Sequence, residues 1–337
     1  MSGADGATGQ MSLTPHQTPE RATGAPEPAA DGDLARRLGP VHARQRIGIE
    51  REYEARIFRH GINFFHIENW YSLHRMIRAL LRASGLSWAG RRNAARVRVN
   101  RNIVASARLP RAFDNFTLLH LSDLHVEMSG QAMRRTGELI GALEYDICVL
   151  TGDYRAMTAG PFAAALSGVT RLTSKIDRPI FAVLGNHDTV RMVPELERAG
   201  VRFLMNESVA IERGGERIHL AGVDDAHYFR VDNVEKAAAL VPRGEFSVLL
   251  SHTPEIFRQA AHAGFDLMLS GHTHGGQICL PGGFAPKLNA RVPRRIALGA
   301  WDHEMMQGYT SSGAGTSIVT ARFFCPPEIT LHRLKAC

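Results

Sequence analysis

Six short apolar runs of buried-strand type lie between residues 116 and 269, and they constrain the fold more than any other feature of the sequence. They read FTLLHL, DICVL, PIFAVL, RIHLAG, FSVLL and FDLML, and stretches such as QAMRRTGELIGALE and PELERAG separate most of them. Apolar runs of this length indicate strands buried on both faces, and strands that alternate with helices indicate an α/β fold. With 337 residues, of which 44% are hydrophobic, the chain can bury a full core.

Polar residues directly follow five of these runs. They are Asp123 and His125, Asp153, Asn186 with His187 and Asp188, His252, and His272 with His274. In open α/β sheets, functional groups gather in the loops beyond the carboxyl ends of the strands. We therefore expect these side chains to meet at one edge of the sheet structure.

The segment SGHTHGGQICLP, residues 270–281, places His272 and His274 two residues apart among small residues. Residues at this spacing in an extended segment point to the same side, and glycine indicates unusual backbone angles or a close approach. Carboxylate, imidazole and amide oxygen suit Mn²⁺, Fe²⁺ or Zn²⁺, and the four scattered cysteines argue against a thiolate site. Two ions about 3.5–4 Å apart, bridged by one carboxylate, would use all the ligands, and such pairs drive phosphoryl chemistry.

The motifs SDLH, TGDY, GNHD, SHTPE and GHTH, in this order, resemble the pattern of the calcineurin-like metallophosphoesterases over about residues 116–334. The resemblance implies an α/β sandwich of two mixed β-sheets flanked by helices. It implies that one metal ion binds Asp123, His125, Asp153 and His274, and that a second binds Asp153, Asn186, His252 and His272. Asp153 would then bridge the two ions. His187 is implied as the general acid or as a phosphate contact, and Asp188 as its orienting partner or a helix cap.

The implied activity is hydrolysis of a phosphodiester or pyrophosphate bond by a hydroxide that two divalent ions (Mn²⁺, Fe²⁺ or Zn²⁺) hold and activate. The strings GHTHGGQICLPGG and GAGTSIVTARFFCPPEITL resemble a bacterial subgroup with membrane-associated members similar to UDP-2,3-diacylglucosamine hydrolases. This implies a lipid-linked or nucleotide-lipid substrate. The alternatives are a nuclease or other nucleotide phosphodiesterase of the same fold, and a non-catalytic metal-binding scaffold.

Other acidic and histidine residues fit ordinary structural roles. Asp224 and Asp225 follow RIHLAG, where we expect a turn. We expect His219, His227 and His303 to be surface or partly buried residues without a special role.

Positive charge is concentrated in the N-terminal third of the chain. Residues 1–115 hold 18 arginines, no lysine and 10 acidic residues, which gives this segment a net charge of +8 (18 − 10). The whole chain has a net charge of +7, so the excess positive charge lies in this segment. Low apolar content predicts a disordered tail over residues 1–45. After this tail we expect a basic, amphipathic, helical extension over residues 46–95. The catalytic domain is expected over residues 96–337.

Within that extension, residues 62–84 have helical periodicity. Trp70, Leu73, Ile77, Leu80 and Leu81 share one face, and Arg75, Arg78 and Arg82 share another. We therefore expect residues 62–98 either to bind an anionic membrane surface or to pack on the catalytic domain. Because the arginines share their segment with an apolar face, nucleic acid fits this region less well.

No run of about 18 apolar residues and no secretory signal stand out, so we expect no membrane-spanning helix. The expected location is cytoplasmic, with peripheral attachment to the inner face of the cytoplasmic membrane. Removal of residues 1–90 is expected to abolish membrane binding and to leave hydrolysis of a soluble diester intact.

Overall fold

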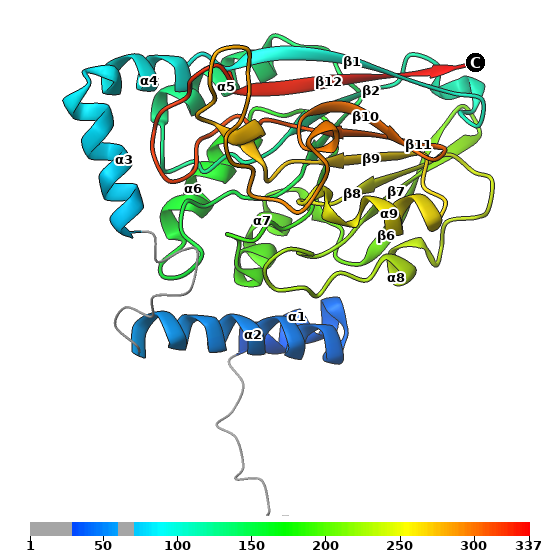
Figure 1. The fold of residues 1–337 in the computed structure, drawn as a ribbon. Helices are drawn as coiled ribbons and strands as arrows, with labels where there is room; N and C mark the ends of the chain where they lie inside the picture. The colour runs from blue at the N-terminus through cyan, green and yellow to red at the C-terminus, as the bar shows by residue number, and fades with distance from the viewer. Residues whose placement is uncertain (1–28, 60–70) are drawn as a thin grey trace, which may run out of the picture.

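The computed structural model describes residues 29–59 and 71–337, and two six-stranded sheets form its body (Figure 1). The first sheet has the order β1 (Arg98–Ser106), β12 (Glu328–Ala336), β2 (Thr117–Leu121), β3 (Ile147–Leu150), β4 (Ile180–Ala182) and β5 (Val201–Phe203). The second has the order β10 (Gly299–His303), β11 (Met306–Thr310), β9 (Leu267–Ser270), β8 (Ser247–Leu250), β7 (Glu216–Gly222) and β6 (Glu207–Arg213).

Both sheets are mixed. In the first, β2 to β5 are parallel and β12 runs antiparallel to β2. In the second, β7, β8, β9 and β11 are parallel, with β6 and β10 antiparallel at the two edges. The predicted fold, two mixed β-sheets flanked by helices, is therefore confirmed.

Three layers of apolar side chains hold this sandwich together. Between the sheets, Leu118 and Val149 of the first pack in one buried cluster with Val248 and Leu269 of the second. Burial of one such side chain stabilises the fold by about 1.5–3 kcal/mol relative to its exposure. On the outer faces, α5 (Gly130–Gly141), α6 (Ala163–Thr173) and α7 (Val193–Arg198) cover the first sheet, and α8 (Val234–Ala238) and α9 (Phe257–His262) cover the second.

All six apolar runs contain strands, namely β2, β3, β4, β7, β8 and β9, and the two helical stretches contain α5 and α7. Strands β5, β6, β10, β11 and β12 lie outside the six expected runs. β6 and β10 are partly exposed edge strands of the second sheet, so they lack the continuous apolar run of a central strand. β11 is an interior, mostly buried strand, but its sequence MQGYT contains Gln307 and Gly308 and therefore has no such run.

The N-terminal region differs from the expected disordered tail over 1–45. Helix α1 (Ala29–Leu38) and the first part of α2 (Pro40–Arg59) already lie within this range. Leu34, Leu38 and Ala43 are buried in the cluster that covers the first sheet. These apolar side chains lie among polar and small residues, so the average composition concealed them.

The remaining helices of this region are α3 (Tyr71–Ala83) and α4 (Leu86–Ala94). The first part of the helix expected over 62–84, with Trp70, lies outside the described residues. Figure 1 shows α1 and α2 below the catalytic domain, α3 along its side and α4 above. None of the helices in the described ranges is both long and apolar enough to cross a bilayer.

Candidate metal centre

The predicted ligands meet where the two sheets adjoin. They lie in the loops after β2, β3 and β4 of the first sheet and after β8 and β9 of the second. All seven are buried: Asp123, His125, Asp153, Asn186, His252, His272 and His274. The parallel strands of both sheets therefore deliver their polar loops to one place, as expected.

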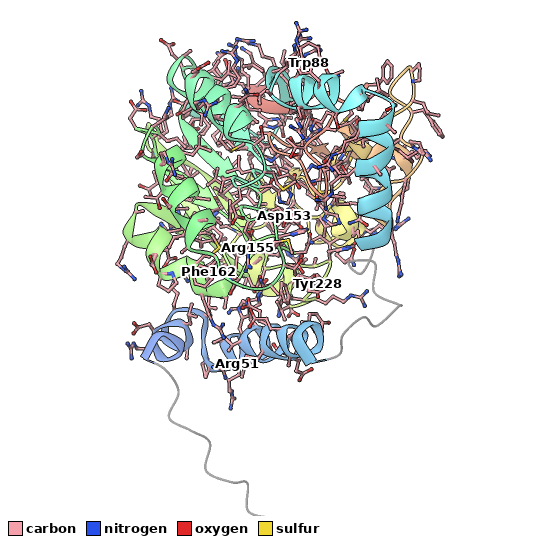
Figure 2. The ribbon with its side chains drawn as sticks, turned by 90° about the vertical axis from the view of Figure 1, so that its left-hand side faces the viewer. Arg51, Trp88, Asp153, Arg155, Phe162 and Tyr228 are labelled. Carbon is pink, nitrogen blue, oxygen red and sulfur yellow. The ribbon has the colours of Figure 1, made fainter. Side chains whose placement is uncertain are left out.

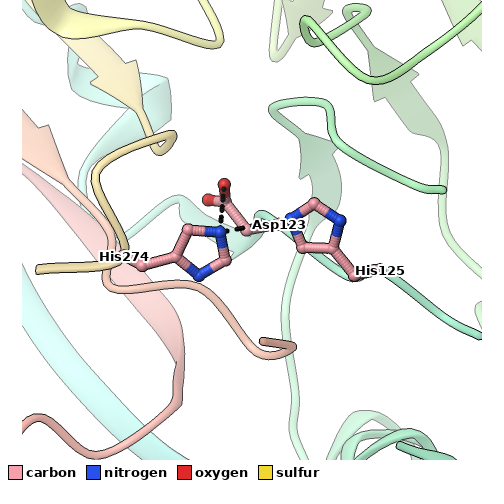
Figure 3. Close-up of side chains that lie close together, drawn as sticks. All are labelled: Asp123, His125 and His274. Atoms are coloured by element: carbon pink, nitrogen blue, oxygen red, sulfur yellow. Dashed lines mark hydrogen bonds and ion pairs between the residues drawn. The ribbon is translucent and has the colours of Figure 1, made fainter. Parts of the chain in front are cut away.

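The ligands form two clusters, in each of which the donor atoms lie within 4.8 Å of one another. One cluster is Asp123, His125 and His274, and the other is Asp153, His252 and His272. Figure 3 shows the rings of His125 and His274 on either side of Asp123.

Asp153 belongs to the second cluster and also lies close to the first. Its Oδ2 atom is 3.3 Å from Nε2 of His252 and 3.6 Å from Nε2 of His125, so the carboxylate is close to a member of each. Asn186 adds its Oδ1 atom 3.0 Å from Nε2 of His252. This is the arrangement that a bridging carboxylate requires.

Backbone carbonyls orient three of the histidine rings. His125 and His252 are bonded through Nδ1 to the carbonyls of Arg155 and Thr151, and His272 through Nε2 to that of Asn289, at 2.7–2.8 Å. Each bond leaves the other ring nitrogen facing the cluster, as in the outer shell of histidine metal sites.

The backbone around the clusters is strained. Five of the seven residues have left-handed φ angles between 37° and 70°: Asp123, His125, Asp153, His272 and His274. Such angles are uncommon outside glycine and cluster at functional sites. With oxygen and nitrogen donors only, these residues fit Mn²⁺, Fe²⁺ or Zn²⁺.

Charges at the centre are strongly coupled. Burial alone would raise the pKa of Asp153, but the His252 and His187 rings hold it well below its usual value. Burial would lower the pKa of His252, yet Asp153 raises it to about 10. The buried negative charge that favours a protonated His252 would equally favour a divalent cation.

Two glycines are required for space beside the aspartates. A Cβ at Gly271 of GHTH would overlap Ser122 Oγ and Asp123 Oδ2, and a Cβ at Gly185 of GNHD would overlap Asp153 Oδ1. The small residues around the histidines thus let the backbone pass directly against the ligands.

His187 is partly exposed beside Asp153, with its Nε2 atom 3.9 Å from Asp153 Oδ2. Its backbone N–H donates to Asp153 Oδ1 at 2.9 Å, and its buried Nδ1 atom has no hydrogen-bond partner among the described residues. Burial lowers the pKa of His187, and Asp153 opposes this shift.

Asp188 has neither of its expected contacts. Its carboxylate accepts hydrogen bonds at 2.8 Å from the backbone N–H groups of Asp153, Tyr154 and Gly185, instead of orienting the His187 ring or capping a helix. Burial and the neighbouring Asp153 raise the pKa of Asp188 to about 7. Asp188 therefore joins the loop after β3 to the loop after β4.

Sequence reasoning did not identify two residues beside the clusters. Arg322 is fully buried. Its Nη2 atom lies 3.3 Å from His274 Nδ1 and donates to the carbonyls of Ser312 and Gly315. His227, which we expected to have no special role, has its ring centroid 4.2 Å from that of His272. Arg322 lies within the string GAGTSIVTARFFCPPEITL, which assigned it no role, and His227 belongs to no motif, so only the folded structure shows these contacts.

Comparisons with known proteins agree with this geometry. A family model described as calcineurin-like phosphoesterase matches residues 116–276. The uncharacterized metallophosphoesterase YkoQ of Bacillus subtilis strain 168 is 32% identical over 254 residues, which cover 72% of this chain and 92% of that protein. YkuE, an uncharacterized metallophosphoesterase of the same strain, is 26% identical, and the match covers 77% of this chain and 92% of YkuE. Phosphodiesterase YaeI of Escherichia coli K12 is 29% identical, and the match covers 65% of this chain and 82% of YaeI.

The lack of space at Gly271 leads to a prediction. Gly271→Ala should displace Asp123 and weaken the binding of Mn²⁺ by about tenfold or more, because the overlap must be relieved by moving the carboxylate. Isothermal titration calorimetry with Mn²⁺ measures this affinity.

Gly141→Ala is the matched control, since no heavy atom lies within 4 Å of the Cβ position at this last residue of α5. It should bind Mn²⁺ like the parent and be equally or slightly more stable. Parent-like Mn²⁺ affinity in a folded Gly271→Ala protein would contradict the packing argument.

Proposed function

The chain belongs to the calcineurin-like phosphoesterase family of metal-dependent phosphoester hydrolases, and we propose that it cleaves a phosphodiester or pyrophosphate bond in a lipid-linked or nucleotide-lipid substrate. The observation that carries the reaction class is the pair of adjacent clusters, in which Asp153 of one cluster also lies close to His125 of the other. The relative YaeI, named a phosphodiesterase, supports the same class.

We assign one divalent ion to Asp123, His125, Asp153 and His274, and another to Asp153, Asn186, His252 and His272. When bound, two such ions supply an acidified water and neutralise charge on the phosphoryl oxygens. Mn²⁺, Fe²⁺ and Zn²⁺ all match the donors. The protein contributes by holding the carboxylates and rings in fixed positions.

In this proposal, His187 acts on the substrate rather than on a metal ion. Its ring is partly exposed beside Asp153, with Nε2 3.9 Å from Asp153 Oδ2, so this nitrogen is placed to donate a hydrogen bond or a proton to an incoming phosphate ester. An anionic ester would raise the pKa of His187, as Asp153 does, and so favour the protonated form that a general acid needs.

The substrate assignment rests on a groove of about 360 Å³ between helices α3 and α4 and the segments at Met128 and residues 318–321. Arg78, Arg82 and Arg91 line it together with the apolar side chains of Leu81, Met128, Ile318, Val319 and Ala321. No ion pair joins these arginines to an acidic residue in the described part of the chain. The backbone N–H of Met128 donates to the carbonyl of His125, so the groove wall continues into a ligand loop. An anionic amphiphile matches this combination of charge and apolar surface.

Exposed apolar residues on α3 and α4 suggest contact with a membrane surface. Leu80 is 60% exposed and Trp88 is 68% exposed, so neither packs fully on the catalytic domain. Figure 2 shows α4 with Trp88, α3 and α2 around the face that carries Asp153. We propose peripheral attachment at the cytoplasmic face of a membrane through this rim.

A nuclease remains the second candidate function, because the same three arginines would also attract nucleic-acid phosphates. The apolar lining of the groove and the exposed Trp88 favour a lipid instead. Parallel assays of the parent protein with a UDP-linked lipid and with plasmid DNA, each with Mn²⁺, distinguish the two.

Asp153→Asn tests the reaction class. It should abolish Mn²⁺-dependent hydrolysis of bis-p-nitrophenyl phosphate and reduce the bound metal, because a neutral amide bridges two cations poorly, while circular dichroism shows a retained fold. Asp302→Asn, at an exposed carboxylate, is the control and should behave like the parent. A folded Asp153→Asn protein with normal turnover would refute the two-ion assignment.

His187→Ala tests the general acid. Loss of a proton donor should slow hydrolysis of an alkyl phosphodiester by about 100-fold or more, with a much smaller effect on a p-nitrophenyl ester, whose leaving group needs no proton. Metal content, measured by mass spectrometry, should stay normal. Equal losses on both esters would assign His187 to phosphate binding alone.

Membrane attachment predicts that the protein sediments with anionic phosphatidylglycerol vesicles at low salt and is released as salt rises. Replacing Arg78, Arg82 and Arg91 with Gln should abolish sedimentation. Replacing the exposed Arg202, Arg217 and Arg243 removes the same charge elsewhere and should not. If the parent ignores these vesicles at low salt, the membrane proposal fails.

A further inference from the structure

A fully buried arginine joins the N-terminal helix α2 to the metal centre. Arg46 donates through Nη2 to the carbonyl oxygen of Asp188 at 2.7 Å and through Nη1 to Asp224 Oδ1 at 3.1 Å. Its Nε donates to Glu50 Oε1 at 2.8 Å, and its guanidinium lies 3.6 Å from the ring centroid of Phe229. The cation is thus fully paired, as burial requires.

Glu50, one turn further along α2, holds the next two residues of the same loop. Its carboxylate is buried and accepts a hydrogen bond from Thr189 Oγ1 at 2.7 Å and from the Val190 backbone N–H at 2.8 Å. Arg46 and Glu50 together fix residues 188–190. These residues immediately follow Asn186 and His187, the proposed ligand and the proposed proton donor.

The same helix fixes a second loop, the one after β7. Asp224 is buried between Arg46 and His42, whose Nε2 atom lies 2.8 Å from Asp224 Oδ2. The Tyr53 ring packs 4.7 Å from that of Tyr228. Between these anchor points lies His227, whose ring contacts His272. Figure 2 shows α2 directly below Tyr228 and the face that carries Asp153.

We propose that α2 is a positioning element of the metal centre. Its residues Arg46 and Glu50 hold the 186–190 loop, and Arg46 and His42 hold the 224–229 loop through Asp224. These two loops carry Asn186, His187 and His227, all of which lie beside the cluster of Asp153, His252 and His272. The inference rests on the proposed function, since it assigns α2 a role in the same site. It also changes the expectation that residues 1–90 can be removed without loss of hydrolysis, because α2 lies within that segment.

Arg46→Met and Arg44→Met in the full-length protein form a matched pair, since both residues lie on α2 but Arg44 is exposed. With bis-p-nitrophenyl phosphate and saturating Mn²⁺, Arg46→Met should lower kcat by about tenfold or more and change KM little. It should weaken one of the two Mn²⁺ sites by about 10- to 100-fold in calorimetric titration, as loss of an outer-shell partner does. Arg44→Met should stay within about twofold of the parent in each quantity.

Thr189 provides a test that leaves the buried arginine in place. Thr189→Val keeps the side-chain shape but removes the hydroxyl, which donates to Glu50 and also accepts from the Arg191 backbone N–H at 3.3 Å, and should lower kcat and the affinity of the same Mn²⁺ site. Thr189→Ser keeps the hydroxyl and should restore both. If Arg46→Met does not fold, this pair decides the question.

Folded Arg46→Met and Thr189→Val proteins that keep parental kcat and both Mn²⁺ affinities would overturn the inference and leave α2 as a mere attachment. Failure of the proposed function would look different. A parent protein that binds Mn²⁺ at two sites yet hydrolyses no ester would refute the activity, and the calorimetric comparison would still show whether α2 controls one site.

Discussion

The burial of Asp153 between the two sheets is the constraint on which the rest of this structure depends. A buried carboxylate is costly unless charges and hydrogen bonds offset it. Here His252 lies 3.3 Å away and the His187 backbone N–H donates to the second oxygen. Because these partners come from different sheets, both sheets must bring their strand ends together at Asp153. The remaining ligands occupy the positions that this meeting of loops creates.

Backbone geometry near Asp153 is set by space as much as by charge. Gly185 and Gly271 let two loops pass against the aspartates, and five of the seven ligands adopt left-handed angles. Asp188 offsets part of this strain by accepting hydrogen bonds from three backbone N–H groups in two loops. The hydrophobic core between the sheets stabilises this unfavourable local structure.

The N-terminal extension completes the site in two different ways. Helix α2 contacts the loops from behind, through the buried ion pairs of Arg46 with Glu50 and Asp224. Helices α3 and α4 instead present arginines that have no ion pair within the described part of the chain, together with exposed apolar side chains, at the rim. We infer that the contact of α2 with the loops supports the chemistry. We also infer that the exposed surface of α3 and α4 directs the protein to a membrane.

The sequence alone determined the six core strands and the seven residues that meet at the centre, and the sandwich fold came from the resemblance of its motifs to a known family. This was possible because strand burial appears as local apolar runs, and because the carboxyl ends of parallel strands share an edge. Only the tertiary structure decided what Arg46, Asp188, Asp224, His227 and Arg322 contact. Each of these residues has at least one partner far away in the chain, such as Asp224 for Arg46 and His274 for Arg322, and no local pattern marks a buried polar residue whose contacts are made at long range. For the same reason no pattern marked the buried face of the helix of residues 40–59, which packs on the loops beside the metal centre.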